Sequence, residues 1–219
     1  MVACPKWESS LGLDYDPDVA VNALSRADKR LGRLIERVGP FTLKPEAGVS
    51  PFQALVRAIV YQQLSGKAAG TIYSRVLALF PGGRFPRPEQ VLKTPDDAMH
   101  RAGMSRAKVA AVKDLALKTL EGVVPPRRKL IPMDDDEIIS QLVRVRGVGE
   151  WTEQMMLIFQ LGRPDVLPVN DLGGRKGFML TYDMEDMPSP LEVQDYGQRW
   201  RPYCAVASWY LWRAVELDG

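Results

Sequence analysis

Apolar side chains recur at helical spacing along most of the chain. One stripe spans residues 52–60 and a second spans residues 109–116, each with apolar side chains three or four positions apart. The members of the two stripes are Phe52, Leu55, Val56, Ile59 and Val60, and Val109, Val112, Leu115 and Ala116. Such spacing places the side chains on one face of a helix. Because alternating strand patterns are scarce, the sequence predicts an all-α protein of roughly ten short helices.

Helix starts are marked by a small polar residue followed by proline or an acidic residue. A capping side chain and proline at the first helical position both favour initiation. The predicted starts are Asp16-Pro17, Ser50-Pro51, Thr94-Pro95, Asp134 and Ser189-Pro190. Between them, glycine- and proline-rich segments such as residues 80–83 and 122–126 predict breaks.

Composition narrows the possible chemistry. The 219 residues carry a net charge of only +2, so any nucleic-acid surface must be a local patch. Cys4 and Cys204 are the only cysteines and cannot supply the four thiolates of an iron–sulfur cluster. His100 is the only histidine, which argues against His-based zinc chemistry and against a Ser-His-Asp triad.

The N-terminal residues, the hydropathy and the cysteine content predict a cytosolic protein. Residues 1–6 lack the apolar run of a signal peptide, and no apolar stretch is long enough to cross a membrane. Two scattered cysteines suit a reducing compartment better than a disulfide framework. We therefore expect no membrane partner.

Residues 142–152 have the pattern of a helix-hairpin-helix element that grips DNA. Gly147 and Gly149 allow positive φ angles and a close backbone approach. Amide groups of the hairpin and of the next helix can then face a phosphate oxygen. The predicted DNA-binding residues here are Arg146, Gly147, Val148, Gly149 and Thr152. Gly-x-Gly alone favours the alternative, a ligand-free turn between two helices, and it is the flanking Leu142, Val145 and Thr152 that favour the DNA-binding hairpin.

The residues around the hairpin carry a family resemblance. The segments that carry it are residues 145–152, 155–159 and 161–171, which end in Val169-Asn170-Asp171. They resemble the helix-hairpin-helix DNA glycosylases, most closely the 3-methyladenine DNA glycosylase II type. The similarity extends from about Pro51 to Trp212. It implies two helical subdomains flanking a DNA-binding cleft, residues 45–165 with the hairpin and residues 1–44 plus 166–219.

The resemblance implies that Asp171, 22 residues beyond Gly149, is catalytic. Cleavage of an N-glycosidic bond builds positive charge on the sugar, and a carboxylate near C1′ stabilises that charge. Asn170-Asp171-Leu172-Gly173 is also a helix-capping pattern. The two roles are compatible.

The position two residues after the second hairpin glycine separates two reaction types. Bifunctional relatives carry a catalytic lysine there, whereas this chain has Trp151, which cannot form a Schiff base. The resemblance therefore implies a monofunctional enzyme that leaves an abasic site. It also implies an aromatic pocket for a flipped base, formed by Trp151, Trp200 and Met155. Core packing is the alternative for both tryptophans.

Residues near the end of the Pro51 helix match the plug that fills the gap left by an extruded nucleotide. Gln63 aligns with that plug, and Gln62 and Leu64 are its neighbours. The alternative is an ordinary polar helix end. Arg106 and Lys108, at a later helix start, are interpreted as phosphate contacts or as part of a solvated face.

The resemblance also implies an ion site at the hairpin, and this chain departs from the family pattern at Glu153. Main-chain carbonyls of Val143, Val145 and Val148 would hold a monovalent or divalent ion, and no cofactor is required. Glu153 stands where relatives more often have alanine, and a negative charge there is unfavourable if it faces DNA.

Together these features predict a base excision repair enzyme that flips and hydrolytically releases alkylated purines such as 3-methyladenine and 7-methylguanine. Its partner would be damaged double-stranded DNA, bound by a monomer in the bacterial nucleoid or in a nucleus. A glycosylase for deaminated or mismatched bases is the alternative within this class. A non-catalytic helix-hairpin-helix module is the alternative outside it.

Overall fold

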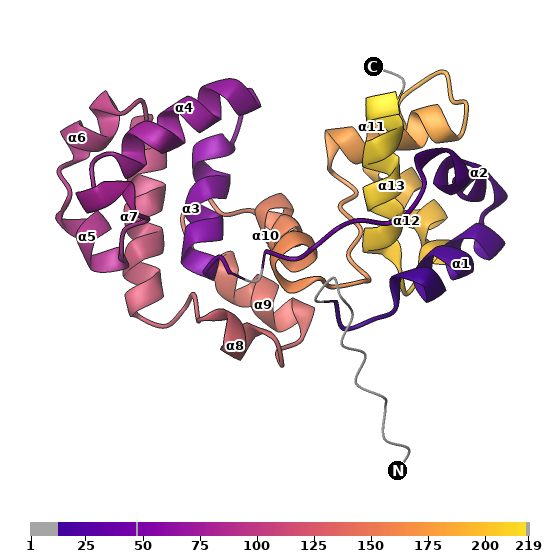
Figure 1. Ribbon diagram of the computed structural model, residues 1–219, viewed down its shortest axis with the longest axis horizontal. Helices are drawn as coiled ribbons and strands as arrows, with labels where there is room; N and C mark the ends of the chain where they lie inside the picture. Colours follow the sequence, from indigo (N-terminus) through magenta and orange to yellow (C-terminus); the bar gives the residue numbers. More distant parts are fainter. Residues whose placement is uncertain (1–12, 47, 218–219) are drawn as a thin grey trace, which may run out of the picture. The chain divides into compact units, whose positions relative to one another are not determined.

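The computed structural model describes residues 13–46 and 48–217. Within these ranges the chain folds entirely into helices and connecting loops, which confirms the predicted all-α class (Figure 1). The described residues divide into two compact units: residues 48–156 form the hairpin unit, and residues 13–46 with 157–217 form the terminal unit. The sequence placed residues 157–165 with the hairpin, whereas in the structure they belong to the terminal unit.

The hairpin unit is built around α3. Its helices are α3 (Pro51–Tyr61), α4 (Gly66–Leu77), α5 (Pro88–Lys93), α6 (Asp96–Arg101), α7 (Arg106–Leu120), α8 (Arg127–Leu130), α9 (Asp135–Leu142) and α10 (Glu150–Met156), with a 3-10 turn at Pro81–Gly83. Helix α3 packs against α4, α7 and α10 (Figure 1). Both predicted apolar stripes, on α3 and α7, are buried. Because these faces are buried in the core, only the remaining faces of α3 and α7 can contact other groups.

Most predicted helix starts are confirmed in atomic detail. The Ser50 hydroxyl accepts from the Gln53 N–H at 3.2 Å, and Ser189 and Glu192 form a reciprocal capping box. Asp16 caps α1 in the same way, and Asp134 stands at the N-cap of α9. A helix, α6, also begins directly after Thr94-Pro95, but the capping role of Thr94 is wrong: Pro95 holds the N-cap position, and the Thr94 hydroxyl donates to the Gln90 carbonyl at the end of α5.

The terminal unit surrounds α13. Its helices are α1 (Pro17–Ala27), α2 (Lys29–Val38), α11 (Leu172–Thr181), α12 (Pro190–Gly197) and α13 (Cys204–Leu217), with a π-helical turn at Leu157–Leu161 and a 3-10 turn at Gln198–Trp200. Helices α2 and α11 pack on α13 (Figure 1). A Cβ atom at Gly177 would lie 1.9 Å from the Leu211 carbonyl oxygen, so only glycine permits this α11–α13 approach.

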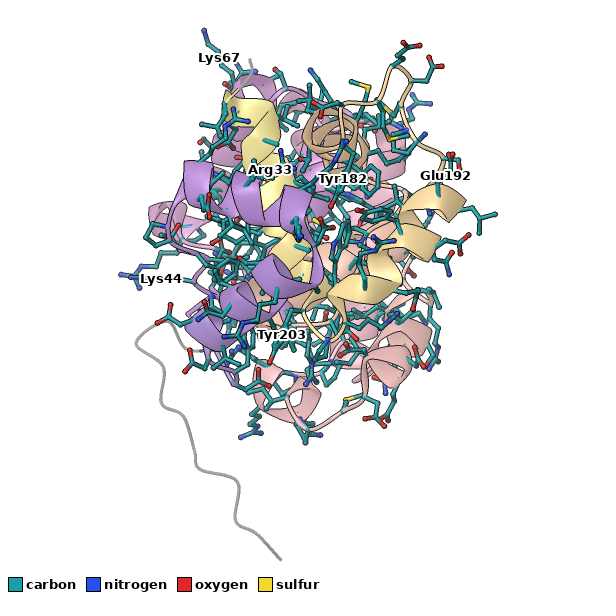
Figure 2. All side chains as sticks on the ribbon, turned by 90° about the vertical axis from the view of Figure 1, so that its right-hand side faces the viewer. Arg33, Lys44, Lys67, Tyr182, Glu192 and Tyr203 are labelled. Atoms are coloured by element: carbon teal, nitrogen blue, oxygen red, sulfur yellow. The ribbon has the colours of Figure 1, made fainter. Side chains whose placement is uncertain are left out.

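A buried carboxylate organises the core of the terminal unit. Asp28 caps α2, accepting from the N–H groups of Arg30 and Leu31, and its Oδ2 accepts from the Tyr182 hydroxyl at 2.5 Å and from Trp200 Nε1 at 3.1 Å. Burial raises the pKa of Asp28, but these hydrogen bonds outweigh burial and hold the pKa below its ordinary value. Figure 2 shows Tyr182 among the side chains of this unit, with Glu192 at its periphery.

The structure bears on some of the residues from which a cytosolic location was predicted. No helix in the described ranges is long and apolar enough to span a bilayer. Cys204 is buried, and burial raises the pKa of its thiol. Cys4 and the rest of residues 1–6 lie outside the described residues.

Candidate functional site

The hairpin, residues 143–149, links α9 to α10 and presents unpaired backbone donors. Gly147 has φ +75°, and Val148 N–H donates to the Val145 carbonyl at 3.1 Å to close the turn. In the described part of the chain, the N–H groups of Gly147, Gly149 and Glu150 have no hydrogen-bond partner. These three amides are the donors with which the hairpin can bind an anion.

Not every predicted hairpin contact is exposed. Arg146 and Gly149 lie on the surface, but the Val148 side chain is buried, so only its backbone can touch a ligand. The prediction for Thr152 is wrong for a direct contact. Its side chain is buried, and its N–H already donates to the Gly149 carbonyl at 2.8 Å.

The loop between α3 and α4 contacts the hairpin. Gln62 Nε2 donates to the Gly147 carbonyl at 2.9 Å, so this amide is already engaged. Gln63 has φ +56°, a left-handed backbone conformation that residues other than glycine rarely adopt. Gln63 and Leu64 are both exposed at the turn. The predicted plug, Gln63, and its neighbour Leu64 are therefore accessible to a ligand, whereas Gln62 is engaged with the hairpin.

In the terminal unit, Asp171 is held by two donors. Its Oδ1 accepts from the Gly174 N–H at 2.6 Å and from Trp212 Nε1 at 2.7 Å. The first bond caps α11, which confirms the capping interpretation, while the catalytic role stays a prediction. Cβ atoms at Gly173 or Gly174 would lie 3.2 or 3.3 Å from this oxygen, so the small residues leave room around it.

Trp212 is a site residue that the sequence did not reveal. Its indole stacks on Phe159 with ring centroids 5.6 Å apart and an interplanar angle of 23°, and both side chains are half-buried. The pair thus places aromatic surface next to the Asp171 carboxylate. No local motif marks Trp212. Trp212 follows Leu211 on α13, and Gly177 of α11 allows α13 to approach closely at Leu211. This approach brings Trp212 to Asp171.

The structure separates the predicted pocket tryptophans. The pocket assignment is wrong for Trp200, which is 1% exposed, donates to Asp28 and packs against Phe178 and Tyr196 in the core. Trp151 is 42% exposed on α10, so the core-packing alternative is wrong for it. Met155, one turn further along α10, is half-buried.

Glu153 faces inward. Its side chain is fully buried, and neither carboxylate oxygen has a hydrogen-bond partner in the described structure. Burial, with the nearby charge of Glu150, raises the pKa of Glu153 to about 7. The departure from the family pattern therefore does not place this charge on an exposed surface.

Comparison with known proteins agrees with this geometry. The family model of the "HhH-GPD superfamily base excision DNA repair protein" matches residues 56–202. DNA-3-methyladenine glycosylase 1 of Schizosaccharomyces pombe is 32% identical over 89% of this chain and 86% of its own length.

Two solved structures are similar along most of their length. That of the Schizosaccharomyces pombe 3-methyladenine DNA glycosylase in complex with abasic DNA superposes with a TM-score of 0.84 and covers 89% of this chain and 95% of that one, at 32% identity. That of DNA-3-methyladenine glycosidase from Bacillus halodurans gives a TM-score of 0.79 at 36% identity, over 89% of this chain and 88% of that one.

Proposed function

Because this chain belongs to the HhH-GPD superfamily of base excision DNA repair proteins, we propose that it is a monofunctional DNA glycosylase that hydrolytically releases alkylated purines from duplex DNA. The observation that carries the proposal is the Asp171 carboxylate, fixed by Gly174 and Trp212 beside the Phe159–Trp212 stack. The relatives named for 3-methyladenine support this base as a substrate, and we propose 7-methylguanine, another methylated purine, as a second one.

The proposed chemistry assigns one role to Asp171. As the bond between C1′ and the purine nitrogen breaks, the base leaves with the bonding electrons and positive charge builds on the sugar. The Asp171 carboxylate stabilises that charge and orients the water whose oxygen then bonds to C1′, and the water passes one proton to the carboxylate, from which it is lost to solvent. Its fixed position avoids the cost of reorganising the carboxylate during the reaction.

Substrate choice follows from the aromatic surface. An alkylated purine such as 3-methyladenine or 7-methylguanine is cationic, and a cation is attracted to the face of an indole ring. Trp212 and Phe159 offer such a surface in the terminal unit, and exposed Trp151 offers another in the hairpin unit. A cationic base is also a good leaving group, so the site needs no general acid.

The hairpin unit supplies the grip on the backbone. The unpaired amides of Gly147, Gly149 and Glu150 suit a phosphate oxygen, and exposed Arg146 adds a positive charge beside them. Such contacts hold DNA without reading its sequence. They therefore suit an enzyme that must search for rare lesions.

An ion at the hairpin is part of the proposal. Its ligands would be the neutral carbonyl oxygens of Val143, Val145 and Val148, a donor set that hard cations accept. The Val145 carbonyl accepts one hydrogen bond, from Val148, and retains a second lone pair. The ion would add positive charge where the backbone phosphate binds.

The proposed partner is double-stranded DNA with damaged bases, bound by a monomer. Such a substrate locates the enzyme with the chromosome, in the bacterial nucleoid or in a nucleus.

Asp171→Asn tests the catalytic assignment. Asparagine keeps an oxygen that accepts from Gly174 and Trp212, so folding and DNA binding should persist. Without the negative charge, we expect base release from a methylated duplex to fall by about 100-fold or more under single-turnover conditions. Wild-type rates in this variant would contradict the assignment.

A lesion panel decides between substrate classes. Release of 3-methyladenine and 7-methylguanine by the wild-type protein supports the proposal. Release of only hypoxanthine, uracil or mismatched bases would indicate the deaminated-base alternative. Binding to abasic DNA without release of any base would indicate a non-catalytic module.

A further inference from the structure

Helix α7 contacts both DNA-facing elements of the hairpin unit. Lys108, Ala111 and Asp114 are spaced three residues apart on α7, so they follow one another along neighbouring turns. We call this set the α7 platform. Each member contacts either the α3–α4 loop, residues 62–65, or the hairpin.

Lys108 holds the end of α3. Its Nζ donates to the carbonyls of Val60 and Gln62, both at 2.8 Å. The ammonium group is therefore turned inward, away from the phosphate contact that its place at a basic helix start suggested. Burial lowers the pKa of Lys108, which agrees with this position. The two bonds satisfy carbonyls at the helix end, just before Gln63 turns to φ +56°.

Asp114 and Ala111 hold the hairpin. Asp114 Oδ2 accepts from the Arg146 N–H at 2.7 Å. A Cβ atom at Gly147 would lie 3.1 Å from the Ala111 side chain, so the hairpin backbone lies directly against α7 at this point. Gln62 completes the connection, because its side-chain amide reaches the Gly147 carbonyl.

We propose that the α7 platform and Gln62 fix the α3–α4 loop relative to the hairpin, with Lys108 and Gln62 as positioning residues for insertion of Gln63 and Leu64 into the duplex. This inference rests on the proposed function. When the hairpin amides bind a phosphate, the inserting side chains are held at a set distance from it. Phosphate binding and insertion then occur as one event. Because the loop is already ordered in the folded protein, DNA binding does not carry the entropic cost of ordering it.

The test measures insertion separately from chemistry. The probes are an undamaged duplex, a duplex with 2-aminopurine opposite a tetrahydrofuran abasic analogue, and a methylated duplex. The variants are Lys108→Met, Lys108→Arg and Gln62→Met. Lys118→Met is the matched control, because Lys118 lies on the same helix and forms an ion pair with exposed Glu121 at its far end.

For Lys108→Met and Gln62→Met we expect affinity for the undamaged duplex to stay within about twofold, since the phosphate-binding amides are unchanged. We expect the 2-aminopurine fluorescence change to be largely lost. The saturating rate of base release should fall by about tenfold or more, with little change in the half-saturating concentration. Lys108→Arg, which keeps a cationic donor, should restore most of both signals, and Lys118→Met should match the wild type.

Full insertion signal and full base release in folded Lys108→Met and Gln62→Met would overturn the inference. If Lys108→Met does not fold, Gln62→Met decides, because its substitution removes one half-exposed side-chain bond and no support for α3. If the wild type releases no methylated base yet shows the insertion signal, the proposed function fails while the inference stands.

Discussion

At the residue scale, the cap on α11 and the proposed catalytic group are the same carboxylate. The bonds from Gly174 and Trp212 to Asp171 Oδ1 fix its orientation. A stabilising charge is most effective when it does not have to reorient as the reaction proceeds. Capping is therefore the means by which the fold holds the group to which the proposed chemistry assigns the stabilising charge.

A second carboxylate, Glu153, makes stability depend on pH. Folding raises the pKa of Glu153 from 4.5 to about 7, so the folded state keeps a proton that the unfolded chain loses between these values. The free energy of unfolding should therefore fall as pH rises from 4.5 to about 7 and stay low above it. Glu153→Gln is neutral at every pH and should escape this loss.

Urea unfolding of both proteins at about pH 5 and about pH 8 measures the effect. We expect the variant to gain on the wild type by on the order of 2–3 kcal/mol between these two pH values. Glu137→Gln removes an exposed glutamate from α9 and should show no such gain. Parallel pH profiles for Glu153→Gln and wild type would show that Glu153 is ionised in the folded protein at neutral pH.

At the element scale, the approach of α11 to α13 determines whether Asp171 and Trp212 meet. Gly177→Ala places a methyl group in the space of the Leu211 carbonyl and must push the helices apart. We expect a loss of roughly 3 kcal/mol or more in the free energy of unfolding, measured by urea denaturation. Gly66→Ala, where a Cβ atom meets nothing within 4 Å, is the control and should change stability by about 1 kcal/mol or less. Equal stability of the two variants would refute the close packing.

Local pattern predicted the helices because caps and apolar spacing act within a few residues. The starts at Ser50 and Ser189 were predictable since each cap bonds a residue three positions away. The start of α6 was predicted, but Thr94 is not its cap, because the same residue type also suits a helix end and its hydroxyl donates backward to Gln90.

The site residues were harder to predict, because their positions are determined by contacts between residues far apart in the sequence. Trp200 and Trp212 lie twelve positions apart near the end of the chain, yet one is core and the other contacts Asp171. Each indole donates to an aspartate far away in the sequence, Trp200 to Asp28, 172 positions earlier, and Trp212 to Asp171. Lys108 was misjudged for the same reason, because the carbonyls that hold it lie at the end of α3 and in the loop that follows, 48 and 46 positions earlier.

At the scale of the whole molecule, net charge is nearly balanced. The chain carries 29 basic and 27 acidic residues, so long-range attraction to DNA is weak and affinity must come from local contacts. Each phosphate neutralised by a basic side chain contributes about 0.9 to the slope of log affinity against log salt. A balanced protein with few such contacts should show a shallow slope.

Arg146 is the side chain on which this argument can be tested, because it is exposed beside the unpaired hairpin amides. We expect Arg146→Ala to reduce the salt slope for an undamaged duplex by about one, as measured by fluorescence anisotropy between roughly 50 and 200 mM salt. Arg84→Ala removes the same charge from an exposed position outside the hairpin and should leave the slope unchanged. Since both variants alter net charge equally, equal slopes would mean that bulk charge controls binding, whereas a loss confined to Arg146→Ala assigns the phosphate contact to the hairpin.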